Sequence, residues 1–239
     1  MATWEYPVSE PAEVRVRIPD GDITVTAAPT ETVTVEVTPS GRSSLDDIDV
    51  DFDAGVVSVI ARKRTGLMSM RSGSFDVDVT VPEGSACRVD TAAGDVDCRG
   101  ELGSLIVTTA SGDTNAERVS GTAEVSTASG DVRLGRAGDV QAKTVSGDVH
   151  VDTAGGDVTC HSVSGDVWVG QVRTGYTKAT TTSGDITVTV VPGLNLRLDL
   201  STLSGDMSSE LAESGGDGEI AVTLTCHTLS GDIRLKRAS

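Results

Sequence analysis

Six aspartates recur along the chain at a nearly fixed interval, and this row of carboxylates is the first feature that could do chemistry. Each aspartate follows a glycine, and the glycines are spaced by 18, 18, 17, 18 and 19 residues. The pairs are Gly94 and Asp95, Gly112 and Asp113, Gly130 and Asp131, Gly147 and Asp148, Gly165 and Asp166, and Gly184 and Asp185. Carboxylates stacked in neighbouring coils would repel one another by roughly 0.9 kcal/mol per pair in water. A bound calcium ion would offset that repulsion.

A turn-forming role explains the same residues without a metal. Glycine reaches positive φ, and the side chains of Asp and of the preceding Ser bond the backbone of tight turns. Calcium-binding β-rolls use a GGxGxDxUx repeat that devotes six residues to the loop, and no Gly-x-Gly-x-Asp occurs here. We therefore predict that these glycines and aspartates form turns, and that the chain uses no metal and no cofactor.

A second candidate for chemistry is a row of three outward residues. Arg133, His150 and Trp168 each stand three residues after a repeat glycine, which places them on one face of adjacent coils about 5 Å apart. Trp168 could offer a stacking plane and Arg133 an anion contact, as in a carbohydrate site. Single exposed aromatic residues are also common on protein surfaces, so an incidental cluster explains the row as well.

The third candidate is a basic and apolar loop in the sequence ARKRTGLMSMRSGS. Its cations and its apolar residues together could dock an acidic partner or touch a membrane surface. A solvated loop that folds over the cap is the more common arrangement of such a segment. The contact residues that we predict are Arg62, Lys63, Arg64, Leu67, Met68, Met70 and Arg71.

Catalytic motifs are not recognisable in the sequence. The three histidines do not support a Ser-His-Asp arrangement, and there is no phosphate-binding loop, dinucleotide fingerprint or zinc-ligand spacing. The four cysteines show no CxxC pairing, which favours free buried thiols over disulfides. We therefore predict a protein that is not an enzyme.

The elements that would position these residues follow from the repeat. A second glycine set, at positions 103, 121, 138, 156 and 175, falls about midway between the first. Two and four residues after each glycine stand small apolar residues, or threonine, which would share the inner face of a strand. Each coil of about 18 residues then holds two strands and two turns. The sequence predicts an all-β fold, a two-sheet parallel β-solenoid, right-handed by the general rule for parallel crossovers.

The domain organisation follows the change in pattern along the chain. Residues 1–86 alternate polar and apolar residues between short turns, which predicts an antiparallel N-terminal cap. Residues 87–192 carry the regular coils. Residues 193–239 keep the phrase at looser intervals and are expected to form irregular C-terminal coils and a cap.

Charge and hydropathy exclude some classes of partner. The formal net charge is −17, whereas nucleic acids and anionic membranes need a basic surface. No segment approaches the ~20 apolar residues of a membrane span. The N-terminal sequence lacks the basic and apolar regions of a secretion signal, so a cytoplasmic location is expected.

The repeated phrase T-x-S-G-D-[VI]-x-[VL] resembles the bacterial "putative adhesin" β-strand-repeat family, a domain of unknown function. The opening EVRVRIPDGDITVTA is similar to its first hairpin, and LRLDLSTLSGDMSSEL and HTLSGDIRLKR are similar to its closing coils. The resemblance implies a β-repeat fold and, for some members, surface attachment or an envelope-stress response. The chain looks most like the short cytoplasmic members.

These observations lead to one functional prediction and one alternative. We expect a non-enzymatic scaffold that binds a protein partner or associates with itself, through the basic loop or the coil ends. The alternative is a carbohydrate-binding or carbohydrate-active protein that uses the face around Trp168.

Overall fold

The structure is a computed structural model that describes residues 1–62, 73–211 and 220–238. The described residues are all-β except for one short 3-10 turn, η1 (Leu45–Asp47). The chain divides into two compact units, Met1–Ser120 and Gly121–Ser239. No helix in the described residues is long and apolar enough to cross a bilayer.

Unit 1 joins antiparallel strands to parallel coils. Its strands are β1 (Ala2–Pro7), β2 (Glu13–Asp20), β3 (Ile23–Ala28), β4 (Thr32–Ser40), β5 (Ile48–Asp53), β6 (Val56–Ala61), β7 (Ser74–Pro82), β8 (Ala86–Ala93), β9 (Val96–Leu102), β10 (Ser104–Thr108) and the first part of β11 (Thr114–Ser126). The antiparallel pairs are β1 with β4, β4 with β7, and β5 with β6. Tyr6 of β1 stacks on Phe52 of β5 with ring centroids 5.0 Å apart.

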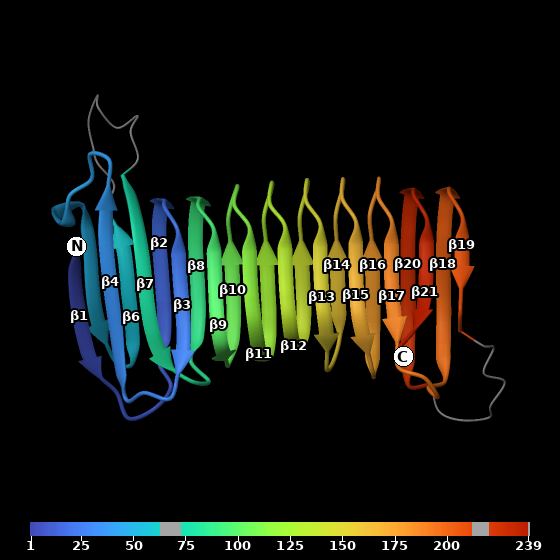
Figure 1. Cartoon of the computed structure of the whole chain (residues 1–239), viewed down its shortest axis with the longest axis horizontal. Helices are drawn as coiled ribbons and strands as arrows, with labels where there is room; N and C mark the ends of the chain where they lie inside the picture. The colour runs from blue at the N-terminus through green and yellow to red at the C-terminus, as the bar shows by residue number, and fades with distance from the viewer. Residues whose placement is uncertain (63–72, 212–219, 239) are drawn as a thin grey trace. The chain divides into compact units, whose positions relative to one another are not determined.

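The expectation that residues 1–86 form an antiparallel cap is wrong for β2 and β3. β2 pairs in parallel with both β6 and β8, and β3 pairs in parallel with both β7 and β9. Figure 1 shows these dark blue strands between cyan and green neighbours. Val14, Val16 and Val25 are buried as coil residues are. Insertion as a coil gives both strand edges a backbone partner, which a hairpin at an edge would not do.

Unit 2 is built of parallel ladders. Its strands are β12 (Val132–Lys143), β13 (Val149–Ala154), β14 (Val158–His161), β15 (Val167–Val172), β16 (Gly175–Thr180), β17 (Ile186–Val190), β18 (Leu196–Ser204), β19 (Met207–Ser209), β20 (Val222–Ser230) and β21 (Ile233–Arg237). One ladder runs β12, β13, β15, β17, β21, β19. The other runs β12, β14, β16, β20, β18.

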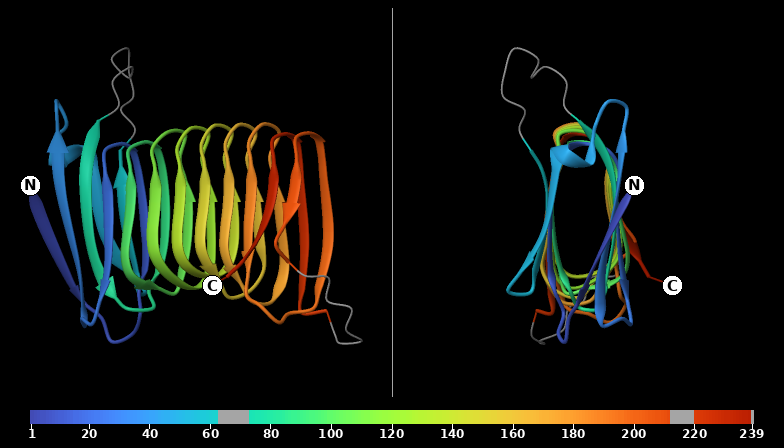
Figure 2. Two further views of the ribbon diagram at one scale, coloured as in Figure 1. Left: turned by 45° about the vertical axis from the view of Figure 1, so that its right-hand side comes forward. Right: turned by 90° about the vertical axis from the view of Figure 1, so that its left-hand side faces the viewer.

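The last coil of the sequence is not the last coil of unit 2. β20 lies between β16 and β18, and β21 lies between β17 and β19. Figures 1 and 2 show the red strands with orange strands on either side. The chain therefore passes over one position, forms the outer coil β18–β19, and returns to fill the gap.

The interior columns expected from the repeat are buried. Val149, Val167 and Ile186 occupy one column in register and are at most 1% exposed. Small side chains suffice there because each of these three strands lies between two neighbouring strands. Threonine replaces valine in two other inner positions: Thr114, in register with Val96, and Thr177, in register with Val158, are fully buried too.

The turn glycines have the conformation that the turn role requires. Gly165 has φ of +154°, and a Cβ atom built on it would lie 2.1 Å from the carbonyl oxygen of Gly147 in the preceding coil. Its N–H donates to the carbonyl of Ser183 in the following coil at 3.0 Å. Only a residue without a side chain allows coils to approach this closely.

Candidate functional site

The stacked aspartates bond the backbone of the neighbouring coil. In unit 2 the N–H of Asp148 donates to Asp131 Oδ1 at 2.9 Å, and the N–H of Asp166 donates to Asp148 Oδ1 at 2.8 Å. In unit 1 the N–H of Asp113 donates to Asp95 Oδ1 at 2.8 Å. One carboxylate oxygen of each acceptor is therefore used to hold two turns together. The described residues contain no group of three or more His, Cys, Asp or Glu placed to hold a metal ion.

Asp185 also binds an arginine of the neighbouring coil. Asp185 accepts the N–H of Asp232 at 2.8 Å and an Nη of Arg234 at 2.5 Å. The backbone hydrogen bond, and after it the guanidinium, lower the pKa of Asp185 below its ordinary value. The other Nη of Arg234 binds Asp232 at 2.6 Å, so one arginine crosses two coils of the column.

The predicted row of outward residues in unit 2 is brought together. Arg133 is in register with His150, and His150 with Trp168. The rings of His150 and Trp168 stack with centroids 4.0 Å apart and an interplanar angle of 13°. His150 Nε2 lies 2.9 Å from Asp152 Oδ1, and Arg133 donates to Asp131 at 2.7 Å. The row is real, and its role as a ligand site stays a prediction.

A shallow groove of about 410 Å³ borders Trp168. Its polar lining includes Asp152, Gln171, Glu210 and Lys236. A Cβ atom at Gly170 would lie 2.1 Å from the carbonyl oxygen of Asp152 and 2.8 Å from Trp168 Cη2, so glycine leaves space here for the neighbouring coil and for the indole. The groove thus joins an aromatic surface to hydrogen-bonding groups, which is chemistry that a sugar ring can use.

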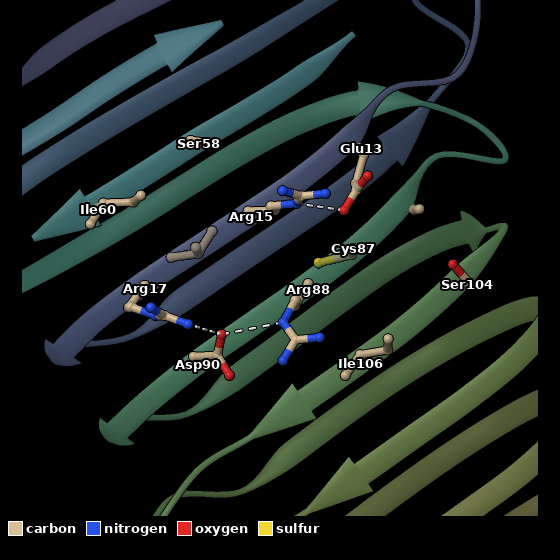
Figure 3. Close-up of a pocket in the computed structure, with 12 residues that line it drawn as sticks. Glu13, Arg15, Arg17, Ser58, Ile60, Cys87, Arg88, Asp90, Ser104 and Ile106 are labelled. Carbon is tan, nitrogen blue, oxygen red and sulfur yellow. Dashed lines mark hydrogen bonds and ion pairs between the residues drawn. The ribbon is translucent and has the colours of Figure 1, made fainter. Parts of the chain in front are cut away.

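A larger groove, of about 490 Å³, lies on the outward face of unit 1 (Figure 3). It crosses four neighbouring parallel strands in the order β6, β2, β8, β10. One row across these strands is Ser58, Arg15, Arg88 and Ile106, and the next begins with Ile60, Arg17 and Asp90. We call this surface the arginine groove.

Two carboxylates orient the three guanidinium groups of the arginine groove. Arg15 Nε donates to Glu13 at 2.6 Å, and Arg88 Nε donates to Asp90 at 3.3 Å. Arg17 Nη2 also binds Asp90, at 3.2 Å. The hydrogen bond to Glu13 raises the pKa of Arg15. These contacts use the Nε atoms of Arg15 and Arg88, so their terminal nitrogens, drawn in blue in Figure 3, remain available to a ligand.

The sequence did not predict this groove. Arg15 and Arg17 alternate with buried valines, which marks them as outward residues. Their position beside Arg88 depends on the insertion of β2 between β6 and β8, and that insertion joins residues 73 positions apart. The alternation in EVRVRI could therefore identify the outward arginines. The sequence carried no signal for the strand order that brings them beside Arg88.

The predicted contact loop lies almost entirely outside the described residues. Arg62 is described, directly after β6, and it pairs with Asp49 through two nitrogens, one of them Nε at 2.7 Å. This pair lowers the pKa of Asp49. The other predicted contact residues, Lys63, Arg64, Leu67, Met68, Met70 and Arg71, are among those that the structure does not describe.

The sequence profile of the family described as Toastrack DUF4097 matches residues 12–237. The chain belongs to this family. The match confirms the resemblance drawn from the repeated phrase, and it fits the all-β coils of both units. No curated protein matches the chain.

Solved structures with the same fold come from species of Bacteroides and Parabacteroides. A protein of Bacteroides fragilis described as a "putative adhesin" is 13% identical over 99% of this chain and 96% of its own, with a TM-score of 0.58. Another, from Parabacteroides merdae, is 10% identical over 98% and 95%, with a TM-score of 0.57. A third, from Parabacteroides distasonis, is 13% identical over 98% and 96%, with a TM-score of 0.55. At these identities the likeness concerns the fold alone.

Proposed function

We propose that this Toastrack protein is a non-enzymatic interaction scaffold that docks an acidic segment of a partner protein in the arginine groove. The observation that carries the proposal is the set of three guanidinium groups on adjacent strands, two of them oriented through Nε. We also propose that the coils that carry the groove form two parallel sheets and wind in a right-handed sense. Proteins of the same fold are described as "putative adhesins", which supports an interaction role.

The chemistry of the groove favours carboxylates. An arginine whose terminal nitrogens are unoccupied binds a carboxylate in a bidentate fork. Four strands spaced by ~4.8 Å give a surface about 14 Å wide, which accommodates several residues of an extended peptide. Ile60 and Ile106 flank the cations, so apolar side chains between the acidic ones would find contacts as well.

The acidity of the rest of the chain would make this docking specific. The net charge of −17 repels an acidic partner from most of the surface. A local excess of guanidinium groups then defines one place and one orientation for it, because like charges elsewhere penalise the alternatives. The interaction should accordingly depend on short-range contacts within the groove.

Binding of a labelled hexaglutamate peptide, followed by fluorescence anisotropy, tests this proposal. We expect the double variant Arg15→Glu, Arg88→Glu to weaken binding by about tenfold or more, or ~1.4 kcal/mol. Added salt should weaken binding to the wild type more than to the variant. Arg136→Glu changes an exposed arginine of unit 2 that belongs to no candidate site, and it serves as the matched control. Equal affinity of the wild type and the double variant would exclude the arginine groove as the docking site.

A further inference from the structure

The outer coil of unit 2 leaves one strand edge open. Among the described residues β18 pairs with β20 alone, whereas β20 pairs with strands on both sides. The backbone groups along the other edge of β18 thus have no strand partner in the described part of the chain. Such an edge is a template for a further strand.

The interior columns also end at β18. Leu196, Leu198 and Leu200 are in register with Val222, Leu224 and Cys226, which are buried core residues. Leu198 is 43% exposed, and its partner Leu224 is 0% exposed. On the companion strand, Met207 is 56% exposed, and its partner Ile233 is 0% exposed. The open edge therefore carries the unfinished end of a hydrophobic core, and we call it the leucine edge.

We propose that the leucine edge pairs with the leucine edge of a second copy of this chain, antiparallel and centred on Leu198. This inference is independent of the arginine groove, which lies in unit 1. In an antiparallel pair, residues directly opposite each other point to the same face of the sheet. Leu198 then faces Leu198 of the second copy, and Leu196 faces Leu200, so the two unfinished cores close on each other.

The charged residues of β18 select this register. Centred on Leu198, the pairing sets Arg197 opposite Asp199 of the second copy, and Asp199 opposite Arg197. A pairing centred on Arg197 or on Asp199 also keeps leucines on the inner face. Each of these alternatives, however, sets like charges directly opposite each other, which is unfavourable. The strand is therefore self-complementary in one register, as a two-fold interface requires.

The two charged side chains are placed to make these contacts. Arg197 and Asp199 are both exposed, on the outward side of β18. The Asp199 side chain is 67% exposed and lies 3.5 Å from His227 Nε2 on the neighbouring strand β20. That contact holds the carboxylate on the outer face without covering it.

Light scattering after size exclusion, over a range of concentrations, gives the first test. We expect a dimer with twice the 24.5 kDa mass of the chain. Arg197→Asp alone and Asp199→Arg alone should each weaken the dimer by about tenfold or more. An equal mixture of the two single variants should restore it, because each Asp then faces an Arg of the other copy.

The mixing experiment distinguishes pairing in this register from nonspecific association. Leu198→Asp should give a monomer, and Leu229→Asp, which changes an exposed leucine on β20, should remain dimeric. If Leu198→Asp does not fold, the outward charge variants still decide the question. A wild type that is monomeric throughout would overturn the proposal, and so would a dimer that is indifferent to the charge variants. A monomer whose β18 amides resist hydrogen exchange would assign the edge to a cover within the same chain.

Discussion

Gly165 shows how a single residue sets the spacing of the coils. The carbonyl of Gly147 occupies the place of a Cβ atom at this position, and the backbone has positive φ. Both facts belong to the turn before β15, where the backbone of one coil lies directly against the backbone of the preceding coil. The sequence marks this position by the repeated Ser-Gly-Asp phrase, so its importance is readable before the structure is known.

We expect Gly165→Ala to lower the free energy of unfolding by at least about 2 kcal/mol, because strain at positive φ and a backbone clash add together. Urea unfolding followed by circular dichroism measures this loss. Gly155→Ala is the matched control, since a Cβ atom there would lie 3.6 Å from its nearest neighbour and should change stability by less than about 0.5 kcal/mol. Equal effects at the two glycines would contradict the role given to the turn.

At the scale of the elements, the inserted coil β20–β21 reverses the usual expectation for a chain end. Residues near a terminus commonly fray, but β20 and β21 are flanked by strands on both sides. We expect the amides of Val222–Ser230 to exchange with deuterium much more slowly than those of Leu196–Ser204, in dilute samples where the chain is monomeric. Exchange mass spectrometry measures both segments at once. Faster exchange in β20 than in β18 would show that the last coil is not inserted.

The columns could be predicted from the sequence, and the order of the coils could not. A period near 18 residues assigns Val149, Val167 and Ile186 to one inner column, because side chains two apart share a face. It also placed Arg133, His150 and Trp168 in one outward row. Every coil interface, however, stacks similar small residues, so β20 fits against β16 or β18 as well as in any other position. The insertions of β2–β3 and β20–β21, and with them the arginine groove and the leucine edge, depend on those degenerate choices.

At the scale of the whole molecule, buried thiols link stability to pH. All four cysteines are buried and free. Burial raises the pKa of Cys160 and of Cys226 to about 12, from an ordinary value of 9.0. The pKa of Cys98 is also raised, first by its hydrogen bond with Cys87 and then by burial. The folded state therefore keeps its thiols protonated at a pH where the unfolded chain releases those protons.

The sign of this linkage gives a test. Below pH 9 the thiol is protonated in the folded and in the unfolded state, and its contribution to the free energy of unfolding is fully present. Between pH 9 and 12 this contribution is lost, because the unfolded chain ionises and the folded chain does not. We expect unfolding free energy to fall by about 1 kcal/mol per pH unit for each such thiol. Urea unfolding between pH 7 and 11 should show a shallower fall for the variant Cys160→Ala, Cys226→Ala, whatever its stability at pH 7. Parallel pH profiles for the wild type and the variant would contradict the assignment.

The insertion of β21 also decides where a fused protein would sit. β21 lies between β17 and β19, and Ala238 donates its N–H to the carbonyl of Val190 at 2.9 Å. Ala238 is therefore held beside the second-outermost coil of unit 2 and not at the outer coil β18–β19. A reporter or an affinity tag joined to the carboxyl end would therefore emerge from the flank of the ladder. Two tagged molecules could still pair through their leucine edges, because the tags would lie beside the interface and not between the two copies.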